Sequence, residues 1–286
     1  MSDYLLKMKE FLASDAEVVL VRVIQTEGSA PRDPGTMMLV NRTRSFGTIG
    51  GGYLEYEAIK NARQLTGSIK FVKHSQEYIL GPVFGQCCGG TVKLSYEKLR
   101  CDRKEQLLKD AERYNRSLDR VLIFGAGHVG QALFRQIKFV PFDVSIIDSR
   151  PASTLDFLLP DECKITPFPE AEIRNAGSGT AYVILTHDHA LDFLLVKEAL
   201  SRDDAAYIGM IGSKTKKAAL KNWLQREGVL NFENVFTPLG RSLTKTKVFD
   251  KRPEVIASFI IVEILISLEM YKNSNDDQRA RNLVVL

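Results

Sequence analysis

The chain has 286 residues, which is long enough for two domains of ordinary size, each with its own hydrophobic core. Its composition, 44% hydrophobic and 26% charged, is that of a globular protein and excludes a largely disordered or fibrous chain. The net charge of +4 comes from Lys and Arg residues spread along the chain, without a basic block, so we expect no nucleic-acid partner.

The N-terminal segment and the longest apolar stretch bear on localisation. The first residues carry charges and lack the apolar core of a signal peptide, so a cytoplasmic protein is expected. The apolar stretch over 255–268 is shorter than the roughly 20 residues that cross a bilayer, and Ser and Glu residues interrupt it. It predicts a buried helix and no membrane partner. Four cysteines in a reducing compartment are expected to remain thiols.

Residues 1–100 are predicted to form a smaller α+β domain. The hydrophobic periodicity and the β-branched runs predict helices and strands in the order helix 4–14, strand 17–25, hairpin 36–50, helix 53–62, strand 70–76 and strand 92–96. Gly and Pro residues between 26 and 35 predict a long loop, a common place for functional residues.

Three consecutive glycines, Gly50, Gly51 and Gly52, precede the predicted helix that begins at Tyr53. Unpaired N–H groups at a helix N-terminus, together with the helix dipole, favour the binding of an anion. Glu55 lies in the first turn of this helix, where the dipole alone also favours an acidic residue. The segment therefore predicts an anion-binding loop, and the role of Glu55 stays open.

A second glycine-rich loop contains two adjacent thiols, in the run Gln86, Cys87, Cys88, Gly89 and Gly90. Adjacent Cα atoms lie about 3.8 Å apart, which disfavours a disulfide. The spacing is also not that of a zinc site. The glycines leave the backbone accessible and favour a thiolate, so the loop predicts a reactive or ligand-holding site. Two buried and functionally silent thiols are the alternative.

Residues 101–119 are predicted to form a helical connector, and 120–286 a second domain. In this domain Gly125, Gly127 and Gly130 follow a strand and open a helix near His128, and Asp148 ends the next strand. This is the dinucleotide-binding fingerprint in its required context. The predicted fold class is therefore α/β, with a Rossmann-like doubly wound parallel sheet, although the fold does not fix the ligand.

A polar cluster follows a buried strand that begins at Tyr182. His187, Asp188 and His189 come at its carboxyl end, where ligands bind in open α/β sheets. Asp188 as the cap of the next helix is an equally good interpretation. Arg150 either lies near a bound phosphate or faces solvent. Further along the chain, Ser213 is a predicted helix cap and Pro253 a predicted helix start.

Taken together, these segments resemble the XdhC/CoxI-type xanthine dehydrogenase accessory proteins, and the thiol motif resembles their XdhC branch. The motifs are Glu27-Gly-Ser-Ala-Pro-Arg-Asp-Pro-Gly35, Gly47-Thr-Ile-Gly-Gly-Gly-Tyr-Leu-Glu55, Leu80-Gly-Pro-Val-Phe-Gly-Gln-Cys-Cys-Gly-Gly90, the Rossmann glycines, Leu185-Thr-His-Asp-His-Ala-Leu-Asp192 and Tyr207-Ile-Gly-Met-Ile-Gly-Ser-Lys214. The segment 239–252 is longer and more basic than the family pattern.

The resemblance implies a chaperone for the molybdenum cofactor. Such a protein binds molybdopterin, protects it while a cysteine desulfurase supplies the sulfido ligand, and inserts it into apo-xanthine dehydrogenase without turnover. It implies that the glycine and histidine loops and Asp148 hold the cofactor, with Cys87 and Cys88 near its molybdenum. A homodimer is expected, and the Rossmann glycines are expected to bind NAD(P), FAD or the cofactor phosphate. An NAD(P)-dependent oxidoreductase and a dinucleotide-binding regulatory protein are the alternatives.

Overall fold

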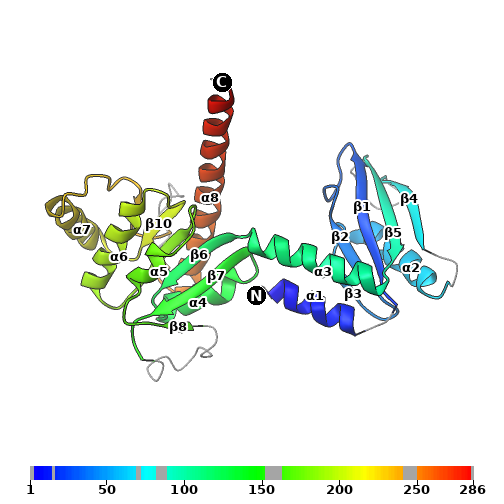
Figure 1. Cartoon of the computed structure of the whole chain (residues 1–286), viewed down its shortest axis with the longest axis horizontal. Helices are drawn as coiled ribbons and strands as arrows, with labels where there is room; N and C mark the ends of the chain where they lie inside the picture. Colours follow the sequence, from blue (N-terminus) through cyan, green and yellow to red (C-terminus); the bar gives the residue numbers. More distant parts are fainter. Residues whose placement is uncertain are drawn as a thin grey trace. The chain divides into compact units, whose positions relative to one another are not determined.

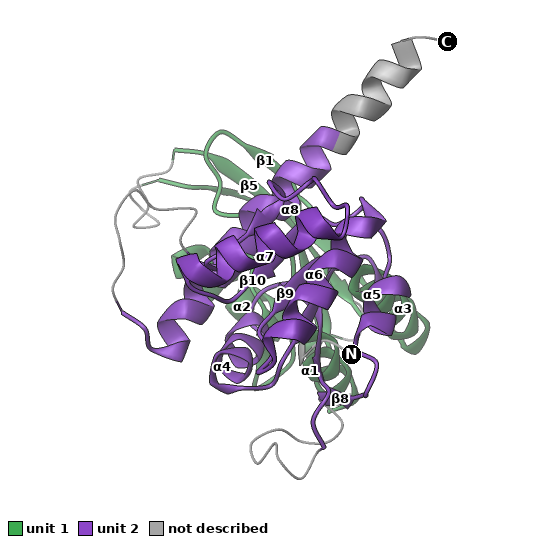
Figure 2. Cartoon of the chain, turned by 90° about the vertical axis from the view of Figure 1, so that its left-hand side faces the viewer, with its two compact units in different colours: residues 1, 3–115 green, residues 2, 116–286 purple. Residues whose placement is uncertain are grey.

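A computed structural model of the chain describes residues 3–14, 17–68, 72–81, 89–151, 163–240 and 250–284, with side chains to Ser274 in the last segment. The chain divides into two compact units, coloured separately in Figure 2. Unit 1 comprises residues 3–115 and unit 2 residues 116–286.

Unit 1 contains a five-stranded antiparallel sheet in the order β3-β2-β1-β5-β4 (Figure 1). Its elements are α1 (Asp3–Ala13), β1 (Val19–Glu27), β2 (Met37–Val40), β3 (Ser45–Gly47), α2 (Gly52–Thr66), β4 (Lys73–Ile79), β5 (Thr91–Lys98) and α3 (Cys101–Arg116). The helices and strands predicted for the first hundred residues are all present, with shifted ends.

The two faces of this sheet bury alternate residues of each strand, as the period of two requires. Val19 and Val21 of β1 pack with Leu54 and Ala58 of α2 on one face. Leu20, on the other face, packs with residues of α1 and α3. Helix α2 therefore covers one side of the sheet, and its N-terminus carries the triple glycine.

Helix α3 occupies most of the predicted connector and packs within unit 1. Its Leu107 is buried against α1, and Glu112 forms an ion pair with Lys9 of α1 at 2.8 Å. The remaining connector residues lead into the first strand of unit 2, which begins at Asp119.

Unit 2 contains a six-stranded, all-parallel sheet in the order β11-β10-β9-β6-β7-β8. Its elements are β6 (Asp119–Phe124), α4 (His128–Ile137), β7 (Phe142–Asp148), β8 (Cys163–Ile165), α5 (Glu170–Arg174), β9 (Ala181–Ile184), α6 (His189–Arg202), β10 (Tyr207–Met210), α7 (Lys214–Arg226), β11 (Val235–Phe236) and α8 (Pro253–Val284). This strand order is that of the doubly wound Rossmann fold, which confirms the predicted fold class.

Helices cover both faces of the parallel sheet. Val121 and Ile123 of β6 pack against residues of α4 and α8, whereas Leu122 and Phe124 pack against residues of α5, α6 and α7. The central strands are therefore buried on both sides, which explains their nearly continuous apolar sequences.

In unit 2, three short elements were not predicted from sequence and one prediction needs correction. The pattern gave no sign of β8, α5 or β11, because elements of 3, 5 and 2 residues are too short to show a period. The helix predicted over 255–268 is present but is not fully buried, since Val262 and Ile266 of α8 are 45% and 43% exposed. No helix in the described part of the chain combines the length and the apolar character needed to cross a membrane.

Candidate functional site

Three loops of unit 1 meet where β1 ends and β5 begins. Glu27, the last residue of β1, pairs with Thr91, the first residue of β5. A Cβ atom on Gly90 would lie 2.2 Å from the Ser29 carbonyl oxygen, and one on Gly50 would lie 2.6 Å from Pro31 Cγ. Glycine at these two positions therefore lets the 28–35 loop approach both other glycine loops.

The triple glycine also sets the path of the chain into α2. Gly50, Gly51 and Gly52 have φ values of +126°, +74° and +64°. Residues with a Cβ rarely adopt this region, so three consecutive residues of this kind require glycine.

The N–H groups of this loop are occupied by a carboxylate of the chain itself. Glu55 Oε2 accepts hydrogen bonds from the Ile49 N–H at 3.1 Å, from the Gly51 N–H at 3.0 Å and from the Thr48 hydroxyl. The Gly50 N–H donates to Thr48 Oγ1 at 3.1 Å. The predicted anion-binding geometry exists, but its anion in this structure is Glu55.

Part of the loop surface remains accessible to a ligand. A Cβ atom on Gly51 or Gly89 would have no neighbour within 4 Å, and Arg32 is exposed. On the first turns of α2, Tyr53 and Tyr56 are 45% and 61% exposed, with ring centroids 6.0 Å apart. These features offer open backbone, a cation and two aromatic rings.

The predicted thiol site, with Gln86, Cys87 and Cys88, lies outside the described residues, in the segment between Gly81 and Gly89. The Leu80 N–H donates to the Gly90 carbonyl at 2.8 Å, so both ends of that segment are at the edge where the three loops meet.

In unit 2, the glycine turn lies at the point where the chain leaves β6 and its neighbour β9 toward opposite sides of the sheet. A Cβ atom on Gly125 would lie 2.4 Å from the Leu185 carbonyl oxygen, and one on Gly130 would lie 1.9 Å from the Gly125 carbonyl oxygen. A Cβ atom on Gly127 would meet nothing within 4 Å. The three glycines thus serve the tight turn, the open approach and the close helix packing that the fingerprint requires.

Asp148 ends β7 as predicted, but its carboxylate is turned inward and is only 3% exposed. Oδ2 accepts a hydrogen bond from the Ala126 N–H at 2.7 Å. The guanidinium of Arg150 binds both oxygens, with Nε 3.0 Å from Oδ1 and Nη2 2.7 Å from Oδ2. Burial opposes ionisation, but these hydrogen bonds outweigh it and lower the pKa of Asp148.

This arrangement decides how well the site fits a dinucleotide. The acid at the end of the second strand normally accepts the ribose hydroxyls. Here Asp148 is already bound by Ala126 and Arg150. The phosphate-binding half of the fingerprint is present, whereas the acid of the ribose-binding half is already hydrogen-bonded within the chain. Arg150 does not simply face solvent, because it forms an ion pair with Asp148, and its predicted position near a bound phosphate stays a prediction.

A second buried ion pair supports the neighbouring loop. Asp192, which is fully buried, accepts hydrogen bonds from the Thr186 N–H at 3.0 Å and the Thr186 hydroxyl at 2.7 Å. Its other oxygen binds the ammonium group of Lys216, which is 8% exposed. This pair was not predicted from sequence, although both residues lie in or just after motifs that the sequence singles out.

The remaining predicted residues lie at the same carboxyl edge of the sheet. Asp188 caps α6, since Oδ1 accepts a hydrogen bond from the Ala190 N–H at 2.8 Å. His187, His189 and His128 are exposed, the last two as the first residues of α6 and α4. Among the described residues, no group of three or more His, Cys, Asp or Glu side chains is arranged to hold a metal ion.

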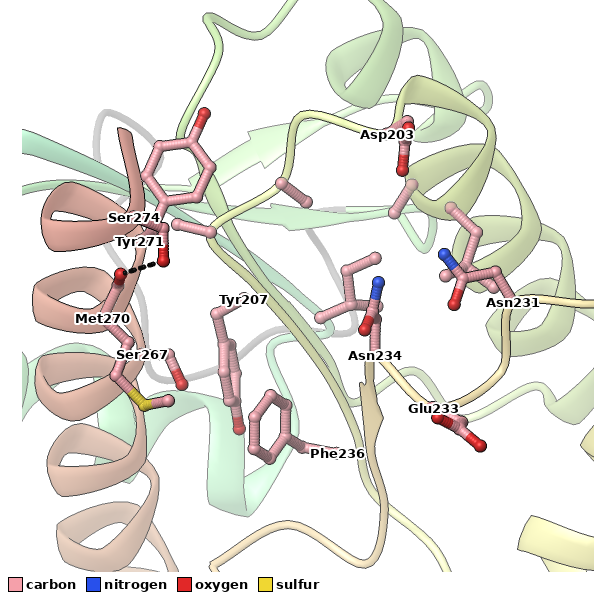
Figure 3. Close-up of a pocket in the computed structure, with 15 residues that line it drawn as sticks. Asp203, Tyr207, Asn231, Glu233, Asn234, Phe236, Ser267, Met270, Tyr271 and Ser274 are labelled. Atoms are coloured by element: carbon pink, nitrogen blue, oxygen red, sulfur yellow. Dashed lines mark hydrogen bonds between the residues drawn. The ribbon is translucent and has the colours of Figure 1, made fainter. Parts of the chain in front are cut away.

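A cavity of about 430 Å³ lies near the opposite edge of the sheet, between α6, α8 and the starts of β10 and β11 (Figure 3). Tyr207 and Phe236 stack in its floor with ring centroids 4.9 Å apart, and Met270 and Tyr271 of α8 form one wall. The Tyr207 hydroxyl donates to buried Glu263 at 2.9 Å, and burial raises the pKa of Tyr207 well above its ordinary value. None of the predicted site residues lines this cavity.

The fold and the glycine loops define a class of protein: a Rossmann-type domain joined to an antiparallel domain in which glycine-containing loops meet at one edge of the sheet. The family comparison agrees with this description. Residues 11–73 match the XdhC and CoxI family, and residues 121–264 match the XdhC Rossmann domain. The chain belongs to the XdhC and CoxI family.

Individual relatives are distant in sequence. The chain is 24% identical to the uncharacterized protein YqeB of Escherichia coli K12, over 86% of this chain but only 42% of YqeB, so it spans less than half of that protein. It is 22% identical to a protein of Bacillus subtilis 168 described as a probable xanthine dehydrogenase subunit, over 93% of this chain and 97% of that protein.

A solved structure shares the fold. The crystal structure of a protein described as a xanthine dehydrogenase from Bacillus halodurans superposes with a TM-score of 0.74 at 21% identity, covering 94% of this chain and 96% of that one. At this identity the likeness extends to the fold of the chain and not to its activity.

Proposed function

We propose that this protein is an accessory protein of xanthine dehydrogenase that binds the molybdenum cofactor in its molybdopterin form. In this role it protects the cofactor while a cysteine desulfurase supplies sulfur, and it inserts the finished cofactor into the apo-dehydrogenase. Family membership supports the proposal, and so do the names of relatives that refer to xanthine dehydrogenase. The protein acts by holding and transferring, without turnover of its own.

The observation that carries the proposal is the meeting of three glycine loops at one edge of unit 1. Gly28, Gly50 and Gly90 lie in close contacts that leave little room for a Cβ, and the thiol segment starts and ends at this edge. These contacts bring the loops together, the open space at Gly51 and Gly89 lets a ligand approach the main chain there, and thiolates are soft ligands that suit a molybdenum cofactor.

The accessible groups fit the chemistry of this cofactor, which supplies the molybdenum centre of the dehydrogenase when bound there. Its phosphate needs N–H groups or a cation, and the open backbone at Gly89 lies in the same group of loops as exposed Arg32. Its flat pterin needs an aromatic surface, and Tyr53 and Tyr56 expose theirs. The N–H groups of Ile49 and Gly51 that bind Glu55 are not counted among these contacts.

The competing function is that of an NAD(P)-dependent oxidoreductase or a dinucleotide-binding regulator. The Rossmann strand order and the glycine turn favour it. The binding of Asp148 by Arg150 weighs against it, because the ribose hydroxyls would have to displace an ion pair. Calorimetric titration with NADH, NADPH and FAD tests this alternative, and hydride transfer to any carbonyl substrate would establish it.

The test of the proposal starts from protein purified from a host that makes molybdopterin. The bound pterin is oxidised and measured by fluorescence, and loaded protein is mixed with cofactor-free xanthine dehydrogenase. We expect activity to appear faster than with an equal concentration of free cofactor. Equal rates would refute the chaperone role.

Thiol variants sharpen this test. We expect Cys87→Ala and Cys88→Ala to lower retained pterin several-fold and to unequal extents, since adjacent side chains in an extended segment point to opposite sides. Cys101→Ala is the matched control, because Cys101 is an exposed thiol on α3. If both loop variants retain and deliver cofactor as the parent does, the thiols are not part of the site.

A further inference from the structure

The cavity between α6, α8 and the starts of β10 and β11 has no part in the function proposed above (Figure 3). Its volume of about 430 Å³ is in the range of small-molecule sites. It lies at the amino ends of β10 and β11, whereas Asp148, Asp188 and the glycine turn lie at the carboxyl edge of the sheet. The cavity is therefore separate from the predicted site residues of unit 2.

Two helices form opposite sides of this cavity. Ser267, Met270, Tyr271 and Ser274 follow the spacing of 3 or 4 that places residues on one face of a helix, and this face of α8 is one wall. On the other side α6 ends at Asp203, which takes the left-handed conformation of a helix C-cap with φ +52°. The helical geometry of both elements thus leaves a defined space between them.

The walls of the cavity are largely apolar, and part of that surface is accessible. Phe236 and Tyr271 are half-buried, and Met270 is 65% exposed. Tyr207 supports Phe236 from the buried side, with ring centroids 4.9 Å apart. Aromatic rings and a thioether both pack favourably against a flat aromatic ring. These walls therefore fit a planar aromatic ligand.

A buried hydroxyl in the cavity has no partner. Ser267 is 8% exposed, and among the described residues nothing forms a hydrogen bond with its side chain. Ser258 and Ser274 of the same helix donate to the carbonyl oxygens four residues earlier, at 3.0 and 2.9 Å. Figure 3 shows the Ser267 hydroxyl pointing from α8 toward Tyr207. Because buried polar groups are normally satisfied, this hydroxyl indicates a hydrogen-bonding ligand.

The charges that line the cavity are all acidic within the described chain. Asp203 and Glu233 are exposed carboxylates without an ion pair, and no described Lys or Arg lines the cavity. The neighbouring Asp204, in contrast, binds Arg202 at 2.6 Å. A cavity with one sign of charge attracts ligands of the opposite sign. It therefore favours an amine and disfavours a phosphate or a carboxylate.

We propose that this cavity binds a small planar aromatic molecule that carries a protonated amine. The ring lies against Phe236 and Met270, and a ring N–H donates to the hydroxyl oxygen of Ser267. The ammonium group faces Asp203 at the rim, where Asn231 and Asn234 offer further amide groups that have no partner among the described side chains. The ligand class differs from molybdopterin and from dinucleotides, because both of these carry phosphates.

The first test is calorimetric titration of the full chain with three probes. Tryptamine has the ring, the ring N–H and the ammonium group. Indole-3-propionate has the same ring with the opposite charge, and 2-cyclohexylethylamine has the charge without an aromatic ring. We expect tryptamine to bind at least about tenfold more tightly than either of the others, since only tryptamine matches both the walls and the charge.

The second test places the ligand in the cavity. Ser267→Ala should raise the dissociation constant of tryptamine about tenfold, because the ring N–H loses its acceptor. Its urea midpoint should be unchanged or higher, since the hydroxyl has no partner in the free protein and Ala favours a helix. A hydroxyl with a merely structural role would show the reverse, a lower midpoint and unchanged binding.

Asp203→Asn tests the charge at the rim. Asn also takes the left-handed conformation readily, so the end of α6 is preserved. We expect the dissociation constant of tryptamine to rise about threefold, as for the loss of a partly exposed charge pair. Glu269→Gln is the matched control, because Glu269 is an exposed acid of α8 that does not line the cavity. It should bind tryptamine as the wild type does.

Three outcomes would overturn the proposal. Tryptamine might bind no more tightly than indole-3-propionate, or it might not bind at millimolar concentration. An unchanged dissociation constant in Ser267→Ala would place the ring outside the cavity. None of these measurements involves the molybdenum cofactor, so their failure and the failure of the proposed function are distinguishable.

Discussion

Both units contain a glycine-rich loop that leads into a helix, and in both a carboxylate of the chain accepts hydrogen bonds from backbone N–H groups there, two in unit 1 and one in unit 2. In unit 1 the carboxylate is Glu55, from the helix that follows the loop. In unit 2 it is Asp148, from the next strand, and Arg150 neutralises it. Among the described residues, no cation is paired with Glu55. A glycine-rich loop before a helix is thus net negative in unit 1 and neutral in unit 2.

A glycine motif is often taken to imply two properties together: a fixed backbone path and N–H groups that are available to a ligand. The glycines fix the path of the backbone, because a Cβ would collide or φ is positive. Whether the N–H groups remain available to a ligand depends on residues elsewhere, such as Asp148, which lies 22 residues after Ala126. A ligand prediction from glycines alone therefore needs a search for the nearest carboxylate.

The largest loss of stability should follow from removing the cation that neutralises a buried carboxylate of unit 2. Lys216→Met leaves Asp192 buried without its cation, which should destabilise the fold by about 3–5 kcal/mol. Lys214→Met, at an exposed position of the same helix, is the control. Urea unfolding measures both.

The double variant Asp192→Asn/Lys216→Met tests whether the charge is the cause. It removes both charges and should recover much of the lost stability. If Lys216→Met unfolds at the same urea concentration as Lys214→Met, the buried pair does not stabilise unit 2 in the way described.

In both units, a smaller loss of stability should distinguish glycines packed against other atoms from glycines with open space around their Cα. Gly130→Ala and Gly90→Ala place a Cβ at 1.9 and 2.2 Å from carbonyl oxygens, so we expect losses of about 1–3 kcal/mol or more. Gly127→Ala and Gly89→Ala are the matched controls and should cost far less, since their Cβ would meet nothing within 4 Å. Equal losses within either pair would contradict the contacts described for that loop.

The smallest effect should be the pH dependence that Asp148 gives to the stability of unit 2. The pKa of Asp148 is lower in the folded protein than its ordinary value of 3.8, so the unfolded chain takes up this proton first as the pH falls. The stabilisation is complete above that ordinary value and is lost as the pH falls through the folded pKa. Asp148→Asn should therefore show a flatter loss of stability between pH 5 and pH 3, in urea titrations at each pH. If the stability of Asp148→Asn falls with pH as steeply as that of the wild type, Asp148 does not contribute to the pH dependence.

Much of the fold could be predicted from sequence because the signals are local. Apolar periodicity located α1 and α2, the glycine fingerprint located β6 and α4, and Asp188 and Ser213 cap the helices that follow them. Each of these signals depends on residues within about one or two turns of each other.

The parts that sequence did not reveal depend on distant partners. Lys216 binds a carboxylate 24 residues away, and nothing in the local pattern of α7 marks it as buried. Glu55 was recognised as a first-turn acid, but its partners Ile49 and Gly51 follow only from the fold of the loop. The apolar stretch of α8 predicted burial, whereas only the face toward the sheet is covered within the described chain.

The packing of α1 against α3 has a consequence for the order of folding during synthesis. Leu12 of α1 is buried with Leu107 of α3, and the Leu12 carbonyl accepts a hydrogen bond from Lys104 at 3.3 Å. Helix α1 is synthesised before α3, so it lacks this partner until Cys101–Arg116 have left the ribosome. Once α3 has emerged, unit 1 can close before the first strand of unit 2 needs a neighbour, so the nascent chain would fold in two successive steps.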